Sequence, residues 1–155
     1  MMMYQYNNID DLSVVFGLSI PQLKSWARKN ETVAMCFDLA HKECKISPNL
    51  KDTVRFLSTK TIAEINNFFG FDPSINKLAW TQVPIITLRS WHKESPVTYV
   101  AFLLGQQKVI VNRLISVAGE DMLQQILNEL DVSEIIKMYC VSPSAYEKLL
   151  CTLKC

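Results

Sequence analysis

Apolar residues recur at helical spacing along most of the chain. The clearest case is residues 121–130, where Met122, Leu123, Ile126, Leu127 and Leu130 form one stripe. Residues 61–69 repeat the pattern with Ile62, Ile65 and Phe68, and Gly70 follows as a helix stop. We therefore expect amphipathic helices in both segments.

Three further segments complete the pattern. Residues 49–57 predict a short helix, and residues 97–104 predict another that Gly105 ends. Residues 108–117 are ambiguous, because the β-branched run at 109–111 suits a strand while Ile110, Leu114 and Val117 suit a helix. No partner strand is evident, so the expected fold class is all-α.

The segment 12–28 carries a more specific pattern. Gly17 stands where a tight turn between two crossing helices needs a positive φ, and the small Ser13 precedes it by four residues. Ser19 is placed to cap a second helix, Ile20–Lys29, which tolerates Pro21 in its first turn. Five apolar positions lock the two helices together: Leu12, Phe16, Leu18, Leu23 and Trp26.

This segment resembles the helix-turn-helix of bacterial and phage DNA-binding regulators. The resemblance covers about 20 residues and implies that the second helix enters the major groove or contacts phosphates. Lys24 and Arg28 would then pair with guanine or phosphate, and Gln22 with adenine. The alternative is an ordinary helical hairpin with a polar face. The outward positions are Ser19, Ile20, Gln22, Lys24, Ser25 and Arg28.

The same signature recurs 65 residues later. Residues 23–28 (LKSWAR) align with residues 88–93 (LRSWHK), and Phe37 aligns with Phe102. The second unit would have Val83 in its turn and residues 84–93 as its second helix, but Gln82 replaces the turn glycine. Its exposed Ile86 would contact a thymine methyl or a protein. The outward positions are Ile85, Ile86, Arg89, Ser90 and Lys93.

A weaker third copy lies at residues 133–150, where we expect a helical hairpin that packs or dimerises rather than a DNA reader. The predicted organisation is tandem helix-turn-helix subdomains followed by a C-terminal helical segment. The first unit takes residues 1–45, the second with its flanking helices takes 46–118, and the C-terminal segment takes 119–155.

Composition narrows the function classes. Hydrophobic residues make up 49% of the 155 residues, enough for a core, but no apolar run is long enough to span a membrane and no signal-peptide pattern is present. The net charge is only +1, with +4 in residues 76–118 and −3 in residues 119–155. Five loosely spaced cysteines argue against a disulfide framework, so we expect a cytoplasmic protein.

No catalytic motif is recognisable. The chain has neither a Gly-rich phosphate loop nor a nucleophile elbow, and Cys36, His41 and Cys44 lack the spacing of a zinc site. His92 is better explained as a surface or phosphate contact than as a general base. We therefore expect no enzyme, no metal and no cofactor.

The function predicted from the sequence is sequence-specific binding of double-stranded DNA by a transcriptional regulator. Ile20–Lys29 and residues 85–93 would enter major grooves like the two halves of a dimer, or a homodimer formed through residues 121–130 would present four such helices. The alternative is a helical adaptor that binds a protein partner, such as a phage-encoded inhibitor or antirepressor. The near-neutral charge and the acidic tail favour this alternative.

Overall fold

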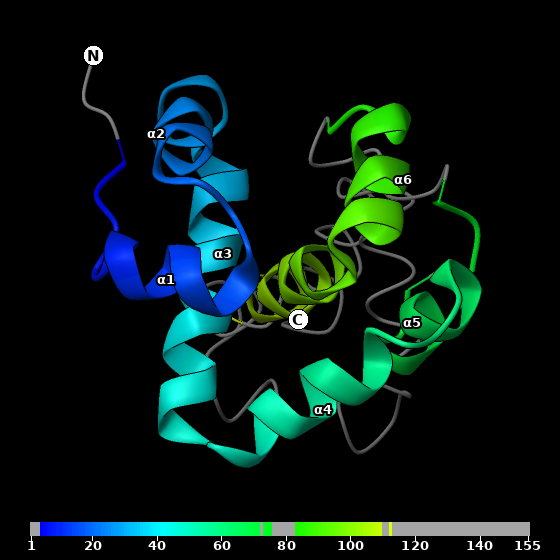
Figure 1. Ribbon diagram of the computed structural model, residues 1–155. Helices are drawn as coiled ribbons and strands as arrows, with labels where there is room; N and C mark the ends of the chain where they lie inside the picture. The colour runs from blue at the N-terminus through cyan, green and yellow to red at the C-terminus, as the bar shows by residue number, and fades with distance from the viewer. Residues whose placement is uncertain (1–3, 72, 76–82, 110–111, 113–155) are drawn as a thin grey trace, which may run out of the picture.

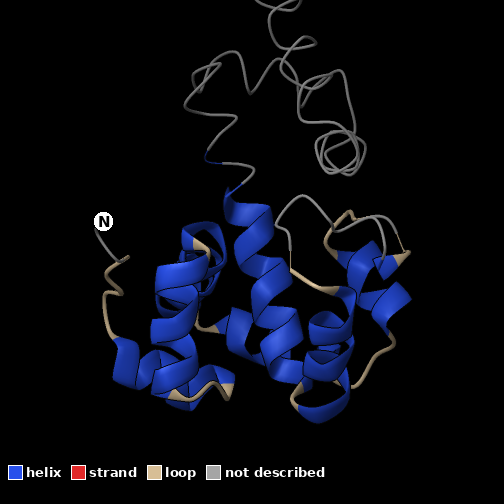
Figure 2. Cartoon of the chain, turned by 90° about the horizontal axis from the view of Figure 1, so that it is seen from above, coloured by secondary structure: helices blue, strands red, loops and turns tan. Residues whose placement is uncertain are grey.

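The computed structural model describes residues 4–71, 73–75, 83–109 and 112 (Figure 1). All regular structure within these residues is helical, which confirms the predicted fold class (Figure 2). Residues 96–109 form one helix, which we call the central helix. The other helices are α1 (Ile9–Phe16), α2 (Ile20–Lys29), α3 (Glu31–Ile46), α4 (Asn49–Leu57), α5 (Ile62–Phe68) and α6 (Ile85–Glu94).

The central helix lies between α1–α3 on one side and α4–α6 on the other (Figure 1). Its residues 98–106 are all buried, including Tyr99, Phe102 and Leu103. They join one cluster with Leu12 and Leu23 of the first predicted unit. The two predicted units therefore share a hydrophobic core, and the boundaries drawn between them stay a prediction.

Gly105 does not end the central helix, contrary to the expectation from sequence. The helix continues to residue 109, and at Gly105 the backbone of α3 passes directly against it. A Cβ atom at this position would lie only 1.7 Å from the carbonyl oxygen of Cys36. The glycine thus serves close helix packing rather than helix termination.

The helix positions match the sequence repeat. α6 begins 65 residues after α2, and the central helix begins 65 residues after α3. Residues paired by the repeat also contact each other, with ring centroids 5.9 Å apart for Trp26 and Trp91 and again for Phe37 and Phe102. Most of the first helix of the second unit falls in residues 76–82, outside the described residues, so the duplication itself stays a prediction.

Residues 110–111 and 113–155 also lie outside the described part of the chain. The predicted helix at 121–130 and the third unit at 133–150 therefore remain expectations from sequence. Of the ambiguous segment 108–117, residues 108, 109 and 112 are helical. None of the described helices combines the length and the apolar character that a membrane span requires.

Candidate nucleic-acid interface

The turn between α1 and α2 is built as the sequence predicted. Gly17 ends α1 in the left-handed conformation with φ 69°, and its N–H donates to the Ser13 carbonyl. The small Ser13 has a further role that the pattern did not show, because its hydroxyl donates to the carbonyl of Leu18 across the turn. This bond links the last turn of α1 to the segment that leads into α2.

The start of α2 is closed by a capping box. The Ser19 hydroxyl accepts from the backbone N–H of Gln22, and the Gln22 side-chain oxygen accepts from the backbone N–H of Ser19. The capping role of Ser19 is thereby confirmed. The second bond occupies the amide oxygen of Gln22, so mainly its amide nitrogen remains to donate to a base.

The outward faces of α2 and α6 are accessible. Leu23 and Ala27 bury one side of α2, while Leu88 and Trp91 bury the corresponding side of α6. Ile86 is 83% exposed, an unusual value for a large apolar side chain. The other candidate residues are exposed or half-buried: Ser19, Ile20, Gln22, Lys24, Ser25 and Arg28 on the first unit, and Ile85, Arg89, Ser90 and Lys93 on the second.

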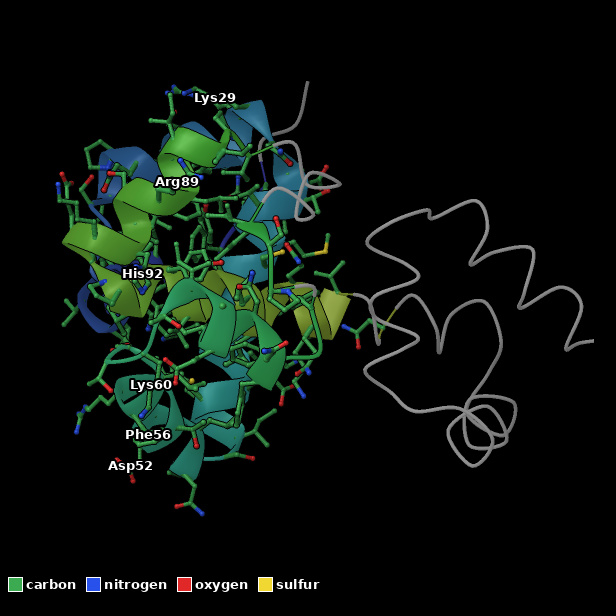
Figure 3. The ribbon with its side chains drawn as sticks, turned by 90° about the vertical axis from the view of Figure 1, so that its right-hand side faces the viewer. Lys29, Asp52, Phe56, Lys60, Arg89 and His92 are labelled. Carbon is green, nitrogen blue, oxygen red and sulfur yellow. The ribbon has the colours of Figure 1, made fainter. Side chains whose placement is uncertain are left out.

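Among the labelled helices, α2 has the highest net positive charge. α2 carries Lys24, Arg28 and Lys29 and no acidic residue. α6 carries Arg89 and Lys93, and its single carboxylate, Glu94, accepts a hydrogen bond from the Ser90 hydroxyl at 3.5 Å. In Figure 3, Lys29 and Arg89 lie toward one end of the molecule, whereas Phe56 and Asp52 of α4 lie toward the opposite end.

α2 and α6 lie next to each other. Trp26 and Trp91 meet edge to face, and a groove of about 380 Å³ is lined from one side by Leu18 and Gln22 and from the other by Thr87 and Ser90. Successive major grooves lie about 34 Å apart, far more than two helices in side-chain contact can span. The expectation that both helices enter successive grooves like the halves of a dimer is therefore wrong for this arrangement.

Both histidines have structural roles. The His92 Nε2 atom donates to the carbonyl of Lys60 at 2.8 Å, and its ring packs edge to face on Tyr99. The sequence predicts a surface or phosphate contact for His92; its side chain is half-buried, and its Nε2 is occupied by this internal bond. His41 is buried in α3, and its Nε2 lies 2.5 Å from a carboxylate oxygen of Asp11. This bond is the main cause that lowers the pKa of Asp11 from 3.8.

Cys36 and Cys44 are both buried free thiols. Cys36 is fully buried, and burial raises the pKa of its thiol far above the usual range. Within the described ranges, no group of three or more His, Cys, Asp or Glu side chains could hold a metal ion.

An N-terminal segment that the sequence analysis did not single out holds α2 in place. The Tyr6 hydroxyl donates to the carbonyl of Leu23 at 2.6 Å, and the Tyr4 hydroxyl donates to the buried carboxylate of Asp38 at 2.7 Å. The segment thereby ties α2 to α3. Two tyrosines separated by one residue give no signal of their partners, which lie 17 and 34 positions away.

No protein-family model, curated protein or solved structure matches this chain.

Proposed function

We propose that the protein binds double-stranded DNA in a sequence-specific way, with α2 as the helix that enters the major groove. The observation that carries this proposal is the combination found at α2. The helix follows a tight turn, its polar face is accessible, and it presents three cations and no acid. A major groove about 12 Å wide admits one helix with this surface.

In this proposal α6 has a different role from α2. Because α6 packs beside α2 and the groove holds a single helix, Arg89 and Lys93 would contact phosphates at the rim of the site. Base recognition would come from Gln22, Lys24 and Arg28. A regulator of this kind would reach a second major groove only through another copy of the chain, as a homodimer.

The test starts with selection of double-stranded DNA from a random pool, followed by binding titrations on the enriched site. Three double variants each remove two cations spaced one helical turn apart: K24A/R28A on α2, R89A/K93A on α6 and K51A/R55A on α4. The α4 pair is the matched control, since α4 lies at the opposite end of the molecule from α2 and α6 (Figure 1).

The three variants should behave differently. K24A/R28A should weaken binding to the enriched site by about 1–3 kcal/mol per lost base contact and relax the sequence preference. R89A/K93A should weaken binding to all sequences and reduce the slope of log K against log salt by up to about 2. K51A/R55A should bind as the wild type does. An absence of any enriched site, or equal effects of all three pairs, would refute the proposal.

One observation favours a protein-binding adaptor as the second candidate. Ile86 is 83% exposed and Ile85 is 39% exposed, so α6 presents an apolar surface beside its cations. Surfaces of this kind commonly serve protein contacts. Salt separates the two functions, because a complex held by apolar contacts keeps its affinity when salt rises, whereas a DNA complex with several phosphate contacts loses orders of magnitude.

A further inference from the structure

A second pocket opens between α1, α3, α4 and the start of the central helix. Its volume is about 240 Å³. That exceeds the roughly 150 Å³ of an engineered cavity that holds benzene and falls just below the usual range for drug-sized ligands. The residues that matter for its chemistry are the apolar Val14, Phe16, Val54 and Val97 and the basic Lys51 and Arg55.

The apolar part of the pocket is open to solvent. Phe16 and Val54 are buried at its base, while Val14 at its edge is 83% exposed. Contact of apolar surface with water at the mouth of a concave site is unfavourable, and an apolar ligand that covers this surface would bind with a favourable free energy. The pocket therefore suits a ligand with a hydrocarbon body.

The charged part of the pocket is a pair of cations. Lys51 and Arg55 lie one turn apart on α4, are exposed, and form no ion pair within 4 Å in the described ranges. The charge of Lys51 nevertheless reaches Asp11 and helps to lower the pKa of that carboxyl. Cys44 also lines the pocket, and burial raises the pKa of its thiol. The positive charge of Lys51 is close enough to lower that pKa in part. Two exposed cations beside an apolar base are complementary to an anion that is attached to an apolar group.

We propose that this pocket binds a small carboxylate with a hydrocarbon body, such as a medium-chain fatty acid. The hydrocarbon would lie against Phe16 and Val54, and the carboxylate would pair with Lys51 and Arg55. The two cations of this site are on α4, which lies opposite α2 and α6 (Figure 1).

The test is calorimetric titration of the full chain with three probes. Decanoate has both the hydrocarbon and the charge, 1-decanol has the hydrocarbon alone, and acetate has the charge alone. Decanoate should bind at one site per chain. Loss of the charge-assisted hydrogen bonds should make decanol bind about tenfold more weakly, and acetate should show no saturable binding.

Variants locate the site. K51Q/R55Q should weaken decanoate binding about tenfold and leave decanol binding unchanged, since only the charge is removed. K24Q/R28Q, which removes a similarly spaced pair from α2, is the matched control and should bind decanoate normally. V14E, at an exposed position, should weaken decanoate through repulsion of its carboxylate. Circular dichroism checks that each variant is folded.

Methyl NMR gives an independent readout. Decanoate should shift the methyl signals of Val14, Val54 and Val97 and leave those of Ile85 and Ile86 on α6 unchanged. Equal affinity for decanoate and decanol, normal decanoate binding by K51Q/R55Q, or methyl shifts elsewhere would overturn the proposal. None of these results bears on DNA binding, which is measured separately with the α2 and α6 variants.

Discussion

Replacement of Gly105 by alanine should affect the stability of the protein in two opposite ways, through helix propensity and through packing. The position lies inside the central helix, where alanine is favoured over glycine by about 1 kcal/mol. Helix propensity alone therefore predicts that the Gly105→Ala variant is more stable. Packing predicts the reverse, because the added Cβ would stand 1.7 Å from the carbonyl oxygen and 2.3 Å from the carbonyl carbon of Cys36.

The geometry sets the size of the packing effect. Ordinary van der Waals contact begins near 3.4 Å, so α3 and the central helix must separate by more than an ångström. The atoms that clash belong to the backbone of Cys36, and no side-chain rotation relieves them. Gaps of 0.5–1 Å already forfeit a quarter to a half of the dispersion energy of each contact, and overpacking typically costs about 1–3 kcal/mol, occasionally more.

We expect the steric cost to exceed the propensity gain by about 2 kcal/mol. For a chain of this length, that corresponds to a melting temperature about 4–8 °C lower than that of the wild type. Thermal unfolding followed by circular dichroism, with urea titration as a second measure, gives the result. Lys108→Ala in the same helix is the control and should change stability little.

A double variant sharpens this experiment. Cys36→Ala shortens the side chain but leaves the clashing backbone atoms in place, so it should not rescue Gly105→Ala. A variant Gly105→Ala that is as stable as the wild type or more stable would show that the two helices do not approach as closely as described, and it would refute the reasoning.

Three further substitutions test the turn and its supports. Asp11→Asn should remove a pH dependence of stability, because the hydrogen bond to His41 lowers the pKa of Asp11 in the folded protein. The stabilisation from ionised Asp11 is complete above about pH 3.8, the usual pKa, and is lost as the pH falls through the lower pKa of the folded protein. Acid titrations of the unfolding free energy of both proteins measure this difference. Tyr6→Phe should cost about 0.5–1.5 kcal/mol in urea unfolding, since it deletes the hydrogen bond to Leu23; an unchanged midpoint would contradict that bond. Ser13→Ala should lower the free energy of unfolding by a similar amount and should also reduce DNA affinity. A variant that loses stability but keeps its DNA affinity would count against a role of the turn in binding.

Local structure could be predicted from the sequence because its causes are local. The limits of α2 follow from the Ser19 cap and from Lys29 in the last turn, and apolar spacing alone predicts α4 at residues 49–57. Gly105 shows where this reasoning fails. A glycine inside an apolar stretch looks like a helix stop unless the neighbouring backbone is known, and that neighbour is 69 positions away in the chain.

The residues of the candidate site could be predicted from the sequence, but the way in which the two helices pack against each other could not. Exposure of Arg28 and Arg89 follows from helical periodicity, whereas the contact between Trp26 and Trp91 depends on the tertiary packing of two segments 65 residues apart. The apolar spacing also gives no sign of the role of Tyr6, whose hydroxyl binds the carbonyl of Leu23, 17 residues away in α2. Side-chain spacing identifies a face of a helix, but it does not say which other helix lies beside that face.

The contact between Trp26 and Trp91 has a consequence for any DNA complex of this protein. It holds α2 and α6 side by side, so that in the proposed complex one chain would offer a single helix to one major groove, with Arg89 and Lys93 at its rim. Two α2 helices can occupy successive grooves only if a second chain supplies the other, about 34 Å away. Recognition of a palindromic site therefore requires dimerisation, whereas a monomer would recognise a short, asymmetric sequence with strongly salt-dependent affinity. The length and symmetry of the selected DNA sequence thus report the number of chains in the complex.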